Sequence, residues 1–189
     1  MVNSSDRYPE PSGHTPEGGV LVGRTDGTKR MVLFEDPQCP YCRQFEELNG
    51  PLVAAEIDAG VLAVEYRMRC FLGPESVRAD NALALAAEAG RFDPLRRLLF
   101  ANQPPEGTGG FTTEDLLDLG AQQGITDSDF VAGVRQQRYE NWVLEREAAY
   151  QAEDPQGTPA AWLEGHPIQP ADLFDRSAFE NRLRSTPRD

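Results

Sequence analysis

Two cysteines separated by two residues, Cys39 and Cys42, have the residue type and the spacing that suit a redox reaction. At the start of a helix, thiols at this spacing can close a small disulfide loop without distorting the flanking chain. The positive end of a helix stabilises a thiolate, so Cys39 is expected to be the attacking sulfur. Cys42 is expected to stay protonated until it resolves a mixed disulfide at Cys39. The pair therefore predicts thiol–disulfide exchange without a metal or an organic cofactor, because the two sulfurs store the electrons.

Two other interpretations of the cysteine pair stay open. A structural zinc ion needs four protein ligands, whereas the remaining candidates are Cys70, His14 and His166, with no second Cys-x-x-C motif. The two cysteines could also be unreactive core residues. The redox pair is favoured over both interpretations. Between the cysteines, Pro40 and Tyr41 form the active-site loop, and Tyr41 is expected to contact a substrate or a partner protein.

The surrounding pattern indicates how the chain holds the pair. Apolar runs over residues 20–23 and 30–35 indicate two strands, the second of which ends shortly before the cysteines. Helical spacing over residues 41–59 places the pair at the start of a long helix, which Pro51 is expected to kink. A strand over residues 61–68 completes a strand–helix–strand unit, whose two strands are expected to pair in parallel.

The pattern becomes helical after residue 76. Helices are expected over residues 79–89, 92–100, 113–121, 127–137 and 139–152. Thr112 or Thr113 is the expected N-cap of the third of these helices, and Thr126 that of the fourth. The loop over residues 102–110 contains two prolines and three glycines and is expected to be exposed and mobile. The chain is then expected to form a strand over 160–163, a turn at 164–165, a strand over 166–169 and a helix over 171–183.

The chain resembles the thioredoxin superfamily at two places. Residues 34–42, Phe-Glu-Asp-Pro-Gln-Cys-Pro-Tyr-Cys, follow a strand, and Gly157, Thr158 and Pro159 precede a later strand. The long helical interval between these motifs resembles the DsbA-like branch of bacterial thiol–disulfide oxidoreductases, and the likeness covers about residues 20–183. It implies an α/β thioredoxin fold with a helical subdomain inserted between the active-site unit and the cis-proline hairpin. The expected parts are a flexible polar tail over 1–19, a thioredoxin-like domain over 20–75 and 154–185, and an inserted helical subdomain over 76–153.

The same resemblance implies how substrates bind. Pro159 is expected to be a cis-proline opposite the cysteines, and the backbone of Thr158 is expected to pair with an extended substrate segment. The implied substrates are protein thiols or disulfides, and the implied redox recycling partner is not identified by the sequence. A cytoplasmic reductase or a glutathione- or small-thiol-dependent enzyme of the same branch is one alternative. A peptide-binding or chaperone-like module is another.

The sequence departs from the family pattern at two points. The Pro40-Tyr41 dipeptide differs from the Pro-His of strongly oxidising members, so the reduction potential is expected between about −120 and −270 mV. Leu33 occupies the position where thioredoxin-like proteins often carry a buried acid. Glu35 and Asp36 are the remaining candidates for a proton relay to the second cysteine, although the favoured interpretation of both is a solvent-facing carboxylate.

The amino-acid composition argues against some classes of binding partner and bears on where the protein is located. Of the 189 residues, 31 are acidic and 18 basic, and the resulting net charge of −13 is expected to repel nucleic acid. No apolar stretch has the length of a membrane span. If Met1 is the native start, the protein is expected to be cytoplasmic; otherwise this chain is the soluble extracytoplasmic part of an exported or anchored protein.

Four residues outside the motifs are expected to have structural rather than catalytic roles. Cys70 is expected to be a small buried core residue, with a regulatory thiol as the alternative. Trp142 and Trp162 are expected to fill the core. His166 is expected to be a surface or packing residue.

Overall fold

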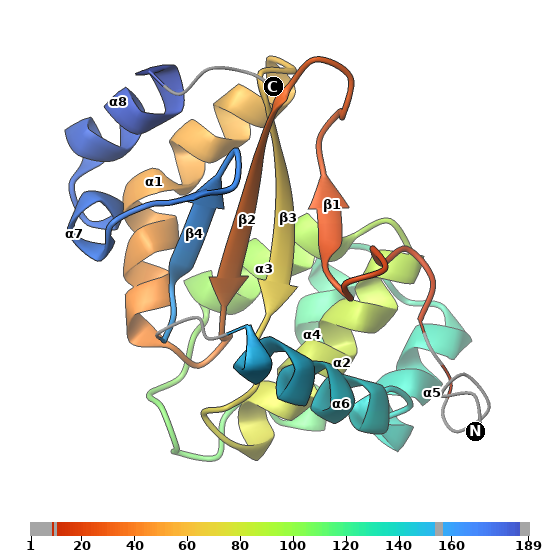
Figure 1. Ribbon diagram of the computed structural model, residues 1–189. Helices are drawn as coiled ribbons and strands as arrows, with labels where there is room; N and C mark the ends of the chain where they lie inside the picture. Colours follow the sequence, from red (N-terminus) through yellow and green to blue (C-terminus); the bar gives the residue numbers. More distant parts are fainter. Residues whose placement is uncertain (1–8, 10, 154–156, 186–189) are drawn as a thin grey trace, which may run out of the picture.

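A mixed five-stranded sheet forms the centre of the protein (Figure 1). The computed structural model describes residues 9, 11–153 and 157–185, so the expected domain boundary at residue 154 and part of the expected tail lie outside it. The strands are β1 (Val20–Val22), β2 (Lys29–Glu35), β3 (Leu62–Met68), β4 (Ala160–Leu163) and β5 (His166–Pro167). They lie in the order β1-β3-β2-β4-β5, with β2 and β3 parallel, as predicted, and the other neighbours antiparallel.

Helices lie on both sides of this sheet. They are α1 (Pro40–Asp58), α2 (Pro74–Glu88), α3 (Phe92–Ala101), α4 (Thr113–Gln122), α5 (Ser128–Gln136), α6 (Glu140–Ala152), α7 (Pro170–Leu173) and α8 (Arg176–Ser185). Figure 1 shows α7 and α8 beside α1, whereas α2 to α6 gather around the opposite end of the sheet. The latter five helices follow one another without a strand between them. None of the described helices is long and apolar enough to cross a membrane.

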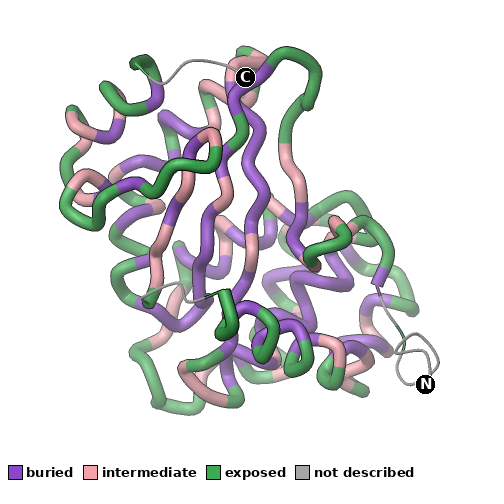
Figure 2. Tube along the Cα trace, in the orientation of Figure 1, coloured by how far each residue is buried: buried purple, intermediate pink, exposed green. Residues whose placement is uncertain are grey.

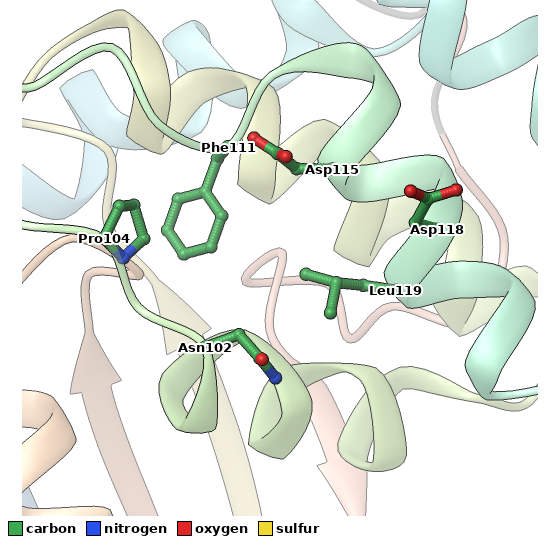
Figure 3. A pocket seen from close by; sticks show the side chains of 6 residues that line it. All are labelled: Asn102, Pro104, Phe111, Asp115, Asp118 and Leu119. Atoms are coloured by element: carbon green, nitrogen blue, oxygen red, sulfur yellow. The ribbon is translucent and has the colours of Figure 1, made fainter.

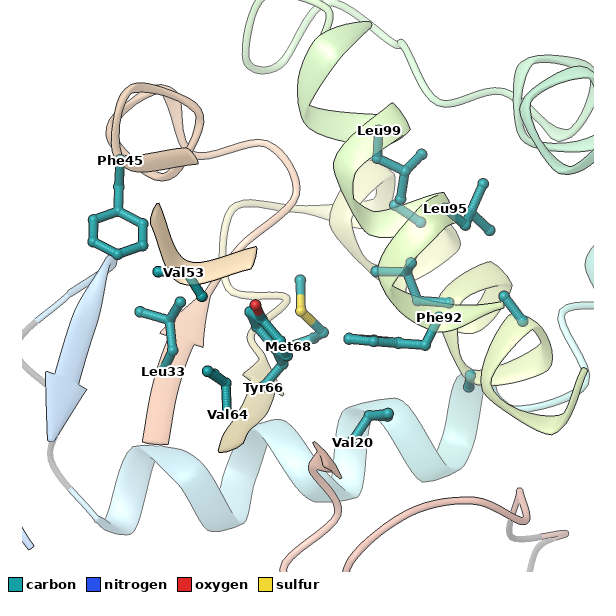
Figure 4. Close-up of a cluster of buried hydrophobic side chains, with 14 of the residues drawn as sticks. Val20, Leu33, Phe45, Val53, Val64, Tyr66, Met68, Phe92, Leu95 and Leu99 are labelled. Carbon is teal, nitrogen blue, oxygen red and sulfur yellow. The ribbon is translucent and has the colours of Figure 1, made fainter. Parts of the chain in front are cut away.

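The core lies between the central strands and the helices α1 and α3. Leu33 of β2 and Tyr66 of β3 are 1% exposed, and they belong to one cluster with Phe45 of α1 and Phe92 and Leu95 of α3 (Figure 4). Figure 2 shows the two central strands as mainly buried segments inside a more exposed shell of helices and loops. The last three residues of β2 are all buried, so the segment that leads into α1 starts from inside the protein.

Two local predictions are wrong. The helix expected over residues 171–183 is two helices, because the Asp175 side chain accepts hydrogen bonds from the backbone N–H groups of Ser177 and Ala178 and thereby starts α8. The N-cap of α5 is Asp127 rather than Thr126, since Asp127 accepts from the backbone N–H of Phe130 at 2.9 Å. For α4, Thr112 is the N-cap and forms a capping box with its third helical residue.

Residues 11–19 differ from the flexible tail that the sequence predicts. The Thr15 hydroxyl donates to the Glu65 carboxylate at 2.9 Å, and the His14 ring lies edge-on to Trp142 with centroids 4.7 Å apart. Trp142 and Trp162 are both half-buried, and Trp142 packs against the hydrophobic core, as the sequence predicts. Trp162 lines a surface pocket on the sheet, because α6 covers only the lower end of that sheet face in Figure 1.

Candidate active site

Cys39 and Cys42 lie where β2 leads into α1. The Cys39 carbonyl oxygen accepts the backbone N–H groups of Cys42 at 3.1 Å and Arg43 at 3.2 Å, so the helix begins directly after Cys39. Pro40 suits the first helical position, where a backbone donor would have no partner within the helix. The two sulfurs are free thiols, and both residues are buried, whereas Tyr41 between them is 61% exposed. Tyr41 is therefore accessible for the contact with a substrate or a partner protein that the sequence predicts, and this contact stays a prediction.

The two thiols of the pair have opposite acidities. Hydrogen bonds from the Cys42 thiol and from backbone N–H groups of the first helical turn lower the pKa of Cys39 to about 6, against the effect of burial. Burial raises the pKa of Cys42 well above its usual value, and the thiolate of Cys39 and the carboxylate of Glu35 add to this effect. At neutral pH, Cys39 is therefore a thiolate and Cys42 a thiol.

A segment from the far end of the chain faces the attacking sulfur. The peptide bond between Thr158 and Pro159 is cis, which confirms the predicted cis-proline. The Cys39 sulfur lies 3.3 Å from the carbonyl oxygen of Thr158, to which its protonated form donates a hydrogen bond, so the fold joins residues that are 119 positions apart. The exposed ring of Tyr41, in the first turn of α1, contacts Phe174, with the two ring centroids 6.1 Å apart.

Asp36 is buried, contrary to the solvent-facing position favoured from the sequence. Its carboxylate accepts hydrogen bonds from the Ser76 hydroxyl, from the backbone N–H of Gln38 at 2.9 Å and from that of Leu72 at 3.2 Å. Burial raises the pKa of Asp36 to about 7, and these hydrogen bonds limit the rise. The carboxylate thus fixes the loop that precedes Cys39 to the segment that leads into α2.

Glu35 is also fully buried, so the solvent-facing interpretation is wrong for both carboxylates. Its Oε2 atom accepts from the Arg96 guanidinium at 3.0 Å, and its Oε1 atom has no hydrogen-bond partner in the structure. Burial raises the pKa of Glu35 to about 8; Arg96 opposes this rise, and the negative charges of Glu46 and Asp93 add to it. Glu35 therefore holds a proton at neutral pH, within electrostatic reach of the Cys42 sulfur.

Arg96 is a site residue that the sequence interpretation missed. It is 1% exposed, and it also donates to Glu46 at 2.8 Å while its guanidinium lies 4.2 Å from the Tyr66 ring centroid. A signal was present in the sequence, because Arg96 lies at helical spacing from Phe92 and Phe100, on the apolar face of α3. A charged residue on such a face is buried with partners in most proteins.

The loop over residues 102–110 is mostly exposed, as its composition predicts, and it also contacts the active-site loop. Gln103 donates through Nε2 to the carbonyl oxygens of Pro37 at 2.8 Å and Cys39 at 3.0 Å. The backbone N–H of Gly107 donates to Oε1 of Gln38 at 3.0 Å. On its other side, this loop borders a surface pocket that Pro104 and residues of α4 line (Figure 3).

The other candidate residues lie apart from this chemistry. Cys70 is buried and burial raises its pKa, as expected of a core thiol, and His166 is exposed as predicted. Within residues 9, 11–153 and 157–185, no three His, Cys, Asp or Glu side chains are grouped so as to hold a metal ion.

Comparison with known proteins gives matches along most of the chain. A family model described as Thioredoxin matches residues 15–178. The thiol:disulfide interchange protein DsbA of Yersinia pestis is 24% identical over 160 residues, which cover 84% of this chain and 76% of that protein. The thiol:disulfide interchange protein DsbG of Pseudomonas aeruginosa is 34% identical over 79 residues, which cover 42% of this chain and 27% of that protein.

Solved structures share the arrangement of strands and helices. BdbD from Bacillus subtilis superposes with a TM-score of 0.79 at 20% identity, over 93% of this chain and 96% of that one. The reduced disulfide bond oxidoreductase DsbG from Mycobacterium tuberculosis superposes with a TM-score of 0.73 at 23% identity, over 91% and 90% of the two chains. At these identities, the structural likeness shows a shared fold.

Proposed function

Because this chain belongs to the thioredoxin family and is a DsbA-like thiol–disulfide oxidoreductase, we propose that it exchanges disulfides with protein substrates through Cys39 and Cys42. The observation that carries this proposal is the opposite acidity of the two thiols beside the cis-proline segment. A low pKa suits Cys39, because this sulfur must attack a disulfide and leave as a thiolate. A high pKa suits Cys42, because this sulfur stays protonated until it resolves the mixed disulfide.

Oxidation of a substrate would proceed in two exchanges. A substrate thiolate attacks the Cys39 sulfur of the Cys39–Cys42 disulfide, which forms a mixed disulfide at Cys39 and releases Cys42 as a thiolate that takes up a proton. A second substrate thiolate then attacks the substrate sulfur of this mixed disulfide and displaces Cys39 as a thiolate. The substrate loses two electrons and gains a disulfide, and the enzyme keeps the two electrons as reduced Cys39 and Cys42.

Two buried carboxyl groups are the candidates for proton exchange with Cys42 in these steps. Glu35, with a pKa of about 8, carries a proton at neutral pH that it can give to the Cys42 thiolate as this forms. In the reverse direction, ionised Glu35 accepts the proton of Cys42. Asp36, with a pKa of about 7, is the second candidate, but three hydrogen bonds already hold its carboxylate.

Substrate binding is assigned to the surface around the attacking sulfur. The Thr158 carbonyl lies 3.3 Å from the Cys39 sulfur, so a substrate strand that pairs with the backbone next to Pro159 would bring its own sulfur to Cys39. The exposed ring of Tyr41 offers an apolar contact beside this strand.

Measuring the reduction potential of the pair tests the proposal. The protein is equilibrated in graded thiol/disulfide buffers, and the reduced fraction is quantified by alkylation. We expect one reversible two-electron transition between about −120 and −270 mV, which Cys39→Ser and Cys42→Ser abolish. Cys70→Ala is the matched control and should leave the transition in place, because Cys70 lies apart from the pair.

The substrate class needs a second measurement. Oxidation of a reduced, unfolded protein is compared with turnover of glutathione as the sole thiol. Faster reaction with the protein supports the proposal, whereas turnover of glutathione alone supports the small-thiol alternative. Absence of a reversible transition, together with binding of unfolded protein by Cys39→Ser, would support the chaperone-like alternative instead.

A further inference from the structure

The loop over residues 102–110 makes polar contacts with each of three consecutive residues of the active-site loop. The Gln103 side-chain amide donates to the carbonyl oxygens of Pro37 and Cys39, at 2.8 and 3.0 Å. The backbone of Gly107 donates to the Gln38 side chain, at 3.0 Å. These contacts join the segment just before the attacking sulfur to the helical region of the chain.

The carbonyl group that Gln103 contacts also starts the helix. The Cys39 oxygen accepts the backbone N–H groups of Cys42 and Arg43, and the donors that face the Cys39 sulfur come from this same first turn. A rotation of the Cys39 peptide plane would therefore change how these donors meet the sulfur. Because Pro40 has no N–H group, the peptide between Cys39 and Pro40 can be held by hydrogen bonds only through its carbonyl oxygen.

We propose that Gln103 is a positioning residue for disulfide exchange, whose amide fixes the Pro37 and Cys39 carbonyl groups so that the first turn of α1 stabilises the attacking sulfur. This inference rests on the proposed function of the pair. It assigns to the loop between α3 and α4 a role in the reactivity of a sulfur that the loop itself does not touch. Gln103 is suited to this role because one side-chain nitrogen has two N–H groups and serves two carbonyl oxygens.

Variants at position 103 separate hydrogen bonding from packing. Gln103→Met keeps the length of the side chain and removes the donor, whereas Gln103→Lys keeps a nitrogen donor at similar reach. The pKa of Cys39 is measured from the pH dependence of alkylation of the reduced protein, and the reduction potential is measured in the same buffers. Asn102→Ala is the matched control, because the adjacent amide donates to Leu98 of its own helix and lines the pocket of Figure 3 instead.

We expect Gln103→Met to raise the pKa of Cys39 by about 0.5 unit, a threefold loss of thiolate stability that converts to a reduction potential about 15 mV more negative. Gln103→Lys should keep the pKa at or below the wild-type value, and Asn102→Ala should leave it unchanged. A merely structural role of Gln103 would lower the free energy of unfolding without moving either the pKa or the potential.

Unchanged pKa and potential in a folded Gln103→Met protein would overturn the inference. If that variant does not fold, Gln103→Ala, which truncates a half-buried side chain, takes its place with the same expected result. The wild-type protein separates the two proposals: without a reversible transition in the wild type the proposed function fails, whereas a normal wild-type transition that is insensitive to Gln103 contradicts only the role of this residue.

Discussion

The protonation of Glu35 decides how easily Cys42 gains or loses its proton. The carboxyl group is fully buried, and one of its oxygens has no hydrogen-bond partner among the described residues. Its cationic partner Arg96 is shared with Glu46 and Asp93. Burial and these neighbouring charges raise the pKa of Glu35 to about 8. Below this pH the group is an acid that can serve the oxidising direction, and above it a base that can serve the reducing direction.

Glu35→Gln should slow the release of substrate from a mixed disulfide at Cys39. In the wild-type protein, we expect the rate of this step to rise as the pH passes about 8, where Glu35 ionises and can accept the Cys42 proton. In the variant this rise should disappear, and the rate above pH 8 should fall by about 10²-fold, the low end of general-base contributions. The measurement is single-turnover decay of a mixed disulfide with a coloured aromatic thiol.

The control for this experiment is Asp93→Asn, which removes a carboxylate that contacts Arg96. This variant should keep the rise in rate but move it to lower pH, because the Asp93 charge helps to raise the pKa of Glu35. An unchanged pH profile in Glu35→Gln would contradict the role of Glu35 and leave Asp36 as the relay candidate. Loss of the profile in Asp36→Asn but not in Glu35→Gln would assign the relay to Asp36.

The sequence identifies the site residues that can be recognised by their type and their spacing. It does not show which of the charged site residues are buried. Cys39, Cys42 and Pro159 follow from the motifs, and the cis peptide bond is confirmed. The alternation of side chains along β2 places Glu35 on one face, but it does not say whether a helix covers that face. In the structure Arg96 from α3 lies there, and this pairing across 61 positions determines the environment of Glu35.

Among the elements, α3 links the helical region to the active-site strand. Its Arg96 is surrounded by Glu35, Glu46 and Asp93, and its remaining contacts are aromatic rings, those of Tyr66 and Phe100. A buried charge in such a cluster contributes less than its attraction suggests. Removing Arg96 would nevertheless leave the buried Glu35 without this partner, whereas Arg97 would still contact Asp93 and Glu46.

Arg96→Met should therefore destabilise the protein by about 3–5 kcal/mol, the range for breaking a buried ion pair by removing one partner. Urea unfolding above pH 8, where Glu35 is ionised in the wild-type protein, measures the change. Arg43→Met is the matched control, because the Arg43–Glu47 pair on α1 is exposed, and it should change the free energy of unfolding by less than about 1 kcal/mol. Equal effects of the two substitutions would contradict the central role of Arg96.

The helical spacing of apolar residues predicted the positions of most helices. Where the observed helix ends differ from the predicted ones, local polar groups account for most of the differences. The helices expected over residues 92–100 and 113–121 are observed within one residue at each end. The helix start that Asp175 creates was missed, because periodicity alone does not distinguish one helix from two that share an apolar face. Pro51 lies within the continuous α1, and the predicted kink there stays a prediction.

For the whole molecule, the predicted thioredoxin fold and the likeness to DsbA-like proteins are confirmed by the family match and by the shared fold of the solved structures. The division into a thioredoxin-like domain and an inserted subdomain stays a prediction. The hydrogen bonds from Gln103 and the ion pair from Arg96 show that the helical region contributes directly to the surroundings of the cysteines. Those contacts were beyond the sequence pattern because each spans more than 60 positions.

The stability of the reduced protein should depend on pH through Cys39. The pKa of Cys39 is about 6 in the folded protein, whereas its ordinary value, which applies to the unfolded chain, is 9.0. Between pH 6 and pH 9 the folded chain therefore binds fewer protons than the unfolded chain. The free energy of unfolding therefore rises with pH over this window, with a slope of at most about 1.4 kcal/mol per pH unit. The contribution is fully present above pH 9 and is lost as the pH falls through 6.

Urea unfolding of the reduced wild-type protein and of Cys39→Ser, compared at a series of pH values, isolates this contribution. Glu35 and most other titrating groups are present in both proteins, so their effects largely cancel in the difference. Asp36 and Cys42 are exceptions, because the Cys39 thiolate raises the pKa of each. We expect the wild type to gain stability over the variant between pH 6 and 9 and to show no further gain above this window. A constant difference would mean that the folded protein does not stabilise the Cys39 thiolate. The same stabilisation favours the reduced state, and it is therefore what would make the oxidised pair a donor of disulfides.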